Sequence, residues 1–141
     1  DDLRWRLDAL VLAAAGEARP VVVIAAERSG AIESRALQIV SRDAAREGLR
    51  WLIALMQAGE REPLPLRPLT AARLIDPAAG DAAAADAWIP HEGGGEGDDE
   101  STRLALRGAM PFEHDIATQR LRALAEAVDA ALAGRAPERI P

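Results

Sequence analysis

DAAREGLRWLIALMQAGEREPLPLRPL, residues 43–69, is the stretch that decides the fold of this chain. Its first part predicts an amphipathic helix, because large apolar residues recur three and four positions apart. These residues are Leu49, Leu52, Ile53 and Met56. A second apolar stripe of Trp51 and Leu55 lies on the far side, so we expect the helix to be buried between two layers.

The end of the stretch predicts a helix stop followed by an extended segment. Gly59 is the expected C-cap, because glycine adopts a positive φ at little cost. Three prolines then enforce an extended path, along which Leu64 and Leu66 can point the same way. The stretch holds no catalytic residue type at a useful spacing, which favours a packing or docking role over an enzyme.

The rest of the chain predicts short elements around this helix. Apolar periodicity and capping residues indicate helices over 3–15, 71–75, 81–88 and 116–133. Gly16 is expected to stop the first of these helices, Asp76-Pro77 the second and Gly134 the last. A β-branched run predicts a buried strand over 20–26, and a second strand is expected over 32–40, centred on 36–40. We expect the two strands to form a hairpin with a loop longer than two residues. The expected helix caps are Ser41 or Asp43 for the central helix, and Thr70 for the helix over 71–75.

These elements predict an α/β fold class, with a small antiparallel hairpin or sheet flanked by helices. The length of 141 residues fits a single domain over 1–141. The absence of an initiator methionine predicts that this domain is a fragment of a longer protein. Residues 91–100, HEGGGEGDDE, are expected to form a flexible, acidic, glycine-rich loop.

Composition excludes several classes of function. All 17 basic residues are arginine, there is no cysteine, and the formal net charge is -6. The missing cysteine excludes disulfides and thiolate metal sites. The acidic balance argues against autonomous binding of DNA, which needs a basic surface. No apolar run approaches the length of a membrane span, so we expect a cytoplasmic protein without membrane contact.

One polar cluster, Phe112-Glu113-His114-Asp115, has two interpretations. A metal site would need further ligands such as His91 and Glu92. The favoured interpretation is a helix N-terminus, where Asp115 caps the helix and Glu113 complements its dipole.

Other candidate motifs favour structural roles. Asp98-Asp99-Glu100 lacks the alternating ligands of a calcium loop, and the glycines of 93–97 lack the lysine of a phosphate loop. The four serines are not in a nucleophile-elbow pattern, and the three tryptophans are expected to be core or interface anchors rather than base-stacking platforms. We therefore predict no catalytic, cofactor-binding or metal-binding residue.

The order of helix, hairpin, helix and Pro-Leu segment resembles the C-terminal domain of the RecC family, the gamma subunit of exodeoxyribonuclease V. The resemblance rests on residues 3–10 leading to Gly16, on 49–59, on the run Arg61-Glu62-Pro63-Leu64-Pro65-Leu66, and on 95–99 with Arg103-Leu104 behind them.

This resemblance implies an inactive relative of the restriction-nuclease-like fold of the partner subunit RecB. Active relatives carry an acidic residue on one strand and an acid-x-Lys pair on the next, which hold a metal and activate water. Here the expected second strand offers Ala36, Leu37 and Gln38, and the chain has no lysine. The resemblance implies a C-terminal fragment of a larger subunit, a non-catalytic domain of a RecBCD-type helicase–nuclease that acts in double-strand break repair and recombination. The implied partners are RecB-like and RecD-like subunits, with DNA bound through the whole complex and no cofactor.

Two alternatives come from other classes of protein. The chain could be a free-standing homodimeric interaction domain that associates through its leucine faces, or a small hydrolase that uses His114 and Asp115. For stability, the sequence predicts that Leu52→Ala costs roughly 2–5 kcal/mol as a buried leucine. It also predicts that Glu96→Ala, as a loop substitution, costs under about 0.5 kcal/mol.

Overall fold

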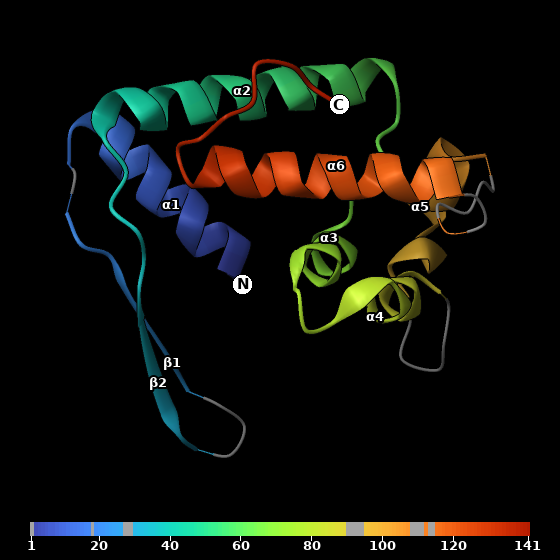
Figure 1. Ribbon diagram of the computed structural model, residues 1–141, viewed down its shortest axis with the longest axis horizontal. Coiled ribbons are helices and arrows are strands. Elements are labelled where there is room, and N and C mark those ends of the chain that lie inside the picture. Colours follow the sequence, from blue (N-terminus) through green and yellow to red (C-terminus); the bar gives the residue numbers. More distant parts are fainter. Residues whose placement is uncertain (1, 18, 27–29, 90–94, 108–111, 113–114) are drawn as a thin grey trace. The chain divides into compact units, whose positions relative to one another are not determined.

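The computed structural model describes residues 2–17, 19–26, 30–89, 95–107, 112 and 115–141. The described part contains α1 (Asp2–Ala15), β1 (Val22–Ala26), β2 (Ile32–Ala36), α2 (Arg42–Arg61), α3 (Pro68–Ile75), α4 (Gly80–Trp88), the one-turn 3-10 helix η1 (Glu96–Asp98), α5 (Glu100–Ala105) and α6 (Asp115–Leu132) (Figure 1). A two-stranded antiparallel sheet among helices confirms the predicted α/β class.

The chain divides into two compact units. The first unit comprises residues 1–54 and 129–138, and the second comprises residues 55–128 and 139–141. Compact units can belong to one domain, so the expected single domain over 1–141 stays a prediction.

The hairpin forms as predicted, but its strands differ from the expectation in length and burial. Val22 pairs with Ala36 and Ala26 with Ile32, so five residues connect the strands. The first strand is not buried: Ile24 is 72% exposed, because the structure describes no third strand or covering layer for this sheet. A β-branched run therefore predicted the strand correctly and its environment wrongly.

The second strand ends at Ala36 rather than continuing to residue 40. Pairing extends by one bond, from the Leu37 N–H to the Val21 carbonyl oxygen at 2.8 Å. Bonded pairs alternate with unbonded ones in an antiparallel sheet, so the next bond across the hairpin would come from Arg19 rather than from Pro20. The next N–H along the chain, that of Arg19, donates instead to the Glu17 carbonyl oxygen at 2.8 Å.

The helix stops and caps of the first unit follow the sequence closely. α1 ends before Gly16, which has a φ of 101°, as predicted. The Ser41 hydroxyl accepts a hydrogen bond from the Ala44 N–H at 3.4 Å, which confirms Ser41 as the cap of α2. After α6, Gly134 has a φ of 69° and terminates the helix, also as predicted.

Gly59 is not the C-cap of α2, and this prediction is wrong. The helix continues to Arg61, and the Glu62 N–H still donates to the Ala58 carbonyl oxygen at 2.9 Å. The helix stops at Pro63 instead, because the residue before a proline avoids the α region.

Of the two apolar stripes predicted on α2, the stripe of Trp51 and Leu55 is buried and the other is not. The buried residues are Ala45, Gly48, Trp51 and Leu55. Leu52 is only half-buried and Met56 is 70% exposed, so the helix is not covered on two sides. The small residues determine this face: a Cβ added at Gly48 would lie 2.4 Å from the Ala131 carbonyl oxygen. The expected cost of Leu52→Ala therefore falls below the range for a buried leucine.

The second unit has a core formed by α3, α4 and α6. Its buried cluster is Leu74, Ala84, Leu121 and Ala125, with Leu66, Ala71, Ile75 and Phe112 packed against it. Arg122 of α6 ties α3 to α4, because its guanidinium donates to the Leu74 carbonyl oxygen at 2.9 Å and pairs with Asp81. The sequence did not indicate a clear secondary structure for residues 101–107, and the structure shows that α5 covers the first part of this stretch.

The N-terminus of α3 is capped by a distant carboxylate rather than by Thr70. The helix begins at Pro68, so Thr70 lies inside its first turn. Glu96 of η1 accepts hydrogen bonds from the Leu69 N–H at 2.9 Å and from the Thr70 N–H at 2.7 Å. Pro68 has no N–H, and the next two N–H groups of the first turn are thus satisfied by a negative charge at the positive end of the dipole.

Glu96 therefore has a structural role that the sequence did not predict. Residues 91–94 of the expected flexible loop lie outside the described residues, whereas 95–100 form η1 and the start of α5. Asp99 also forms an ion pair with Arg67 at 3.5 Å, next to the same helix end. The expected neutrality of Glu96→Ala is accordingly wrong.

We now expect Glu96→Ala to lower the free energy of unfolding by about 1 kcal/mol, within the roughly 0.5–2 kcal/mol range for losing a helix cap. The physical reason is that two backbone N–H groups lose their acceptor. Denaturant titration of the variant against the parent measures the difference. Asp98→Ala is the matched control, since Asp98 is exposed in the same turn, and equal effects from the two substitutions would contradict the capping role.

Candidate docking surface

The polar residues suggested by the sequence do not form a described active site. His91, Glu92, Glu113 and His114 lie outside the described residues, so neither the metal site nor the hydrolase is tested. Asp115 is the first residue of α6, which fits the helix start expected there. Within the described ranges, no group of three or more His, Asp or Glu side chains could hold a metal ion.

The other candidate motifs hold helices together where the structure describes them. The Asp99 carboxylate accepts a hydrogen bond from the Thr102 N–H at 3.1 Å and caps α5. Gly97 packs so closely on Trp88 that an added Cβ would lie 2.6 Å from the indole Nε1. Ser34 lies on β2 and Ser41 caps α2, while Ser29, Gly93 and Gly94 are outside the described residues.

The tryptophans were predicted to be core or interface anchors, and the structure places two of them in the core and one at the surface. Trp88 is 1% exposed and Trp51 is 7% exposed. Trp5, in contrast, is 42% exposed on α1. A half-exposed tryptophan on a helix is typical of a contact surface rather than of a core.

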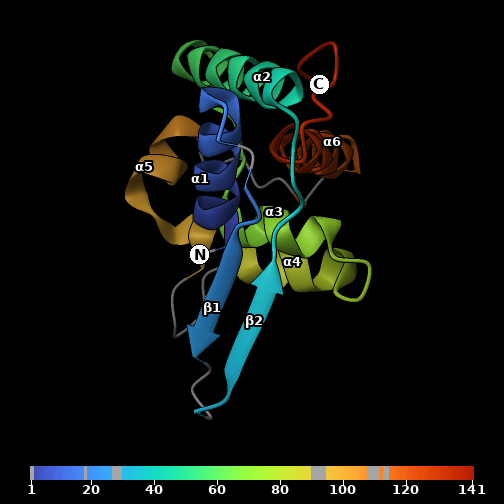
Figure 2. The ribbon, with the colours of Figure 1, turned by 90° about the vertical axis from the view of Figure 1, so that its left-hand side faces the viewer.

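The hairpin presents an apolar face. Residues that alternate along a strand share a face, so Val22 and Ile24 lie on the same side as Ile32 of β2. All three are exposed, and the hairpin projects away from α1 within the first unit (Figure 2). We refer to Val22, Ile24 and Ile32 as the hairpin patch.

The opposite face of the hairpin carries charge. Glu33 and Arg35 are two positions apart on β2, paired with Ala25 and Val23. The observed strand thus has an acid-x-cation spacing, which was missed because the expected strand over 32–40 was centred on 36–40. Arginine replaces lysine in this spacing, and β1 has the sequence VVIAA without an acidic residue, so the first strand lacks the acid that active relatives carry there.

Helix α1 is apolar on more than its buried side. Leu10, Ala13 and Ala14 are buried, while two further groups are exposed to either side: Leu3, Leu7 and Val11, and Trp5 and Leu12. A helix that is apolar nearly all round is typically covered on more than one face. The first unit therefore presents a second apolar surface, which we call the α1 stripe and define by Leu3, Leu7 and Val11.

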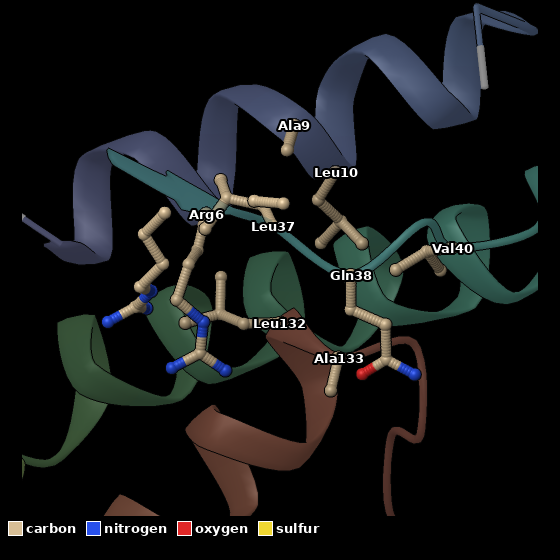
Figure 3. Close-up of a pocket in the computed structure, with 10 residues that line it drawn as sticks. Arg6, Ala9, Leu10, Leu37, Gln38, Val40, Leu132 and Ala133 are labelled. Atoms are coloured by element: carbon tan, nitrogen blue, oxygen red, sulfur yellow. The ribbon is translucent and has the colours of Figure 1, made fainter. Parts of the chain in front are cut away.

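A pocket of about 210 Å³ lies where the chain leaves β2 for α2. Its apolar lining comes from the aliphatic side chains of Leu10, Leu37, Val40 and Leu132 (Figure 3). Its polar atoms come from Arg6, Arg35 and Gln38. Arg6 is already engaged: one nitrogen donates to the Asp129 carboxylate at 2.6 Å and another to the Asp129 carbonyl oxygen at 3.0 Å. This pair fastens α1 to the end of α6, so the pocket is part of the scaffold that supports the hairpin.

These features define a small α/β domain that exposes apolar side chains on one helix and on a projecting hairpin. The family model described as RecC C-terminal domain matches residues 1–79, which span α1 to α3. Because this match covers more than half of the chain, the chain belongs to the RecC C-terminal domain family. Comparison with curated proteins gives no match, and comparison with solved structures gives none either.

The match confirms the family indicated by the sequence. The helix and Pro-Leu runs that carried the resemblance lie inside 1–79, and the acidic segment after residue 95 lies outside it. The structure describes no helix that is both long and apolar enough to span a membrane.

Proposed function

We propose that this chain is a non-catalytic domain of a RecBCD-type helicase–nuclease subunit, acting in the cytoplasm in double-strand break repair and recombination. The observation that carries the proposal is the family match over 1–79, which contains both the hairpin patch and the α1 stripe. No catalytic, cofactor-binding or metal-binding residue is assigned.

The exposed surface supports a role in assembly. Monomeric proteins rarely expose contiguous apolar patches of large size, and such patches mark contacts with other proteins. Partners of the class implied by the family are RecB-like and RecD-like subunits. DNA is engaged through the whole complex, since a net charge of -6 leaves little counterion release to drive binding by this domain alone.

The test is assembly of the full natural chain with the RecB-like and RecD-like subunits of the same organism. We expect Leu7→Glu, on the α1 stripe, to weaken assembly by about tenfold or more, because a charge is placed in an apolar contact. Asp8→Ala is the control, since Asp8 is also exposed on α1 and is polar. Affinity is measured by interferometry, and thermal unfolding of both variants checks that they fold.

The homodimer is the second candidate, and the exposed leucines of α1 favour it. Sedimentation velocity of the chain alone distinguishes a homodimer from a chain that assembles only with other subunits. A concentration-dependent dimer that is lost in Leu7→Glu, with no binding of the other subunits, would replace the assembly proposal with the homodimer.

A further inference from the structure

The two edges of the hairpin differ in backbone exposure and in charge. The Leu37 N–H bonds to the Val21 carbonyl, and in an antiparallel pair such bonded residues alternate with unbonded ones. Val22, Ile24 and Ala26 therefore direct their N–H and C=O groups away from β2. By the same rule, Ile32, Ser34 and Ala36 direct theirs away from β1.

Only the β2 edge is protected against further pairing. Natural sheets protect their edge strands with charged side chains, prolines or bulges. β2 carries Glu33 and Arg35, whereas β1 is VVIAA, with no charge and no proline. In the part of the chain that the structure describes, no strand covers either edge.

We propose that the outer edge of β1 receives an extended strand from another polypeptide. The strand it fits is uncharged over about five residues, because a charge opposite β1 would lose water without gaining a partner. Its alternate side chains are apolar, since they continue the hairpin patch of Val22, Ile24 and Ile32. An isolated two-stranded hairpin is at best marginally stable in water, and a third strand supplies the missing hydrogen bonds.

The occupant is a different protein rather than a second copy of this chain. A symmetric pairing of β1 with β1 would bury little beyond two five-residue strands, because the hairpin projects away from α1 (Figure 2). Stable complexes bury roughly 1,200–2,000 Å² in total. A strand that belongs to another subunit does not have to supply this buried area alone, because the same subunit is also bound through other contacts. This inference rests on the proposed function and names one contact within it.

The test compares Ile24→Pro with Ser34→Pro in the full natural chain. These residues are cross-strand partners, and each loses an N–H that faces away from the hairpin. With the RecB-like and RecD-like subunits as probe, we expect Ile24→Pro to weaken assembly by about tenfold and Ser34→Pro to change it by less than about twofold. Equal effects, or a larger effect of Ser34→Pro, would overturn the assignment of the edge.

Hydrogen exchange of the unsubstituted chain provides a measurement that does not depend on a variant folding. Assembly should slow exchange at the amides of Val22, Ile24 and Ala26 and leave those of Ile32, Ser34 and Ala36 unchanged. Assembly without this protection overturns the strand addition and leaves the proposed function intact. Failure to assemble overturns both. If the β1 amides are already protected in the monomer, the chain itself covers the edge. If their protection arises with self-association, a second copy covers it. Either result overturns the foreign strand.

Discussion

Trp88→Ala is expected to lower the free energy of unfolding by about 3–5 kcal/mol, the range for truncating a fully buried tryptophan. Trp88 ends α4, is 1% exposed, and meets Phe112 edge to face with ring centroids 6.4 Å apart. Gly97 packs directly on the indole, and Gly95 packs on the backbone carbonyls of Trp88 and Ile89, so neither position has room for a side chain. Removing the indole leaves a cavity bounded by backbone that cannot collapse, and denaturant titration followed by circular dichroism measures the loss.

Trp5→Ala is the matched control for this prediction. It removes the same side chain from a half-exposed position on α1, so the expected loss is about 1 kcal/mol or less. A loss from Trp5→Ala as large as that from Trp88→Ala would mean that Trp5 belongs to the core.

Leu10→Ala is expected to lower the free energy of unfolding by about 2–5 kcal/mol. Leu10 is 1% exposed, and its Cδ2 would lie 3.4 Å from a Cβ added at Gly48. It thus fills the narrow space where α1 meets α2, and an alanine there leaves a void beside the pocket. Chemical denaturation compares it with Leu12→Ala, two residues along the same helix and largely exposed, for which the loss should stay under about 1 kcal/mol. Similar losses for the two leucines would contradict the assigned face of α1.

The sequence predicted the boundaries that depend on local chemistry. Gly16 and Gly134 stop their helices because a positive φ is cheap only for glycine, and Ser41 caps α2 because its hydroxyl reaches a free N–H. The hairpin and the α/β class followed in the same way. Such signals lie within a few residues of the structure that they determine, so one sequence contains them in full.

Features that depend on contacts between segments far apart in the sequence were not predictable. Ala45 and Gly48 define the buried face of α2 because a neighbouring backbone comes close, whereas hydrophobic periodicity gives weight only to large residues. Glu96 caps a helix that begins 28 residues earlier, and nothing near it in the sequence indicates that contact.

The candidate docking surface was only partly foreseen. The homodimer alternative expected leucine faces to associate with a partner, but it did not single out α1. The hairpin patch was missed because its β-branched residues indicated burial within this chain. The structure describes no third strand or covering layer for this hairpin, and this observation led to the proposal that a strand from another polypeptide completes it.

The uncharged edge of β1 also limits how the chain can be produced. Residues 21–26 are six consecutive uncharged residues, four of them β-branched, and an open edge of that kind templates pairing between identical chains. A chain made in excess of its partners therefore accumulates a surface that promotes aggregation. In the proposed assembly, balanced synthesis of the subunits protects this edge, because the foreign strand then covers it.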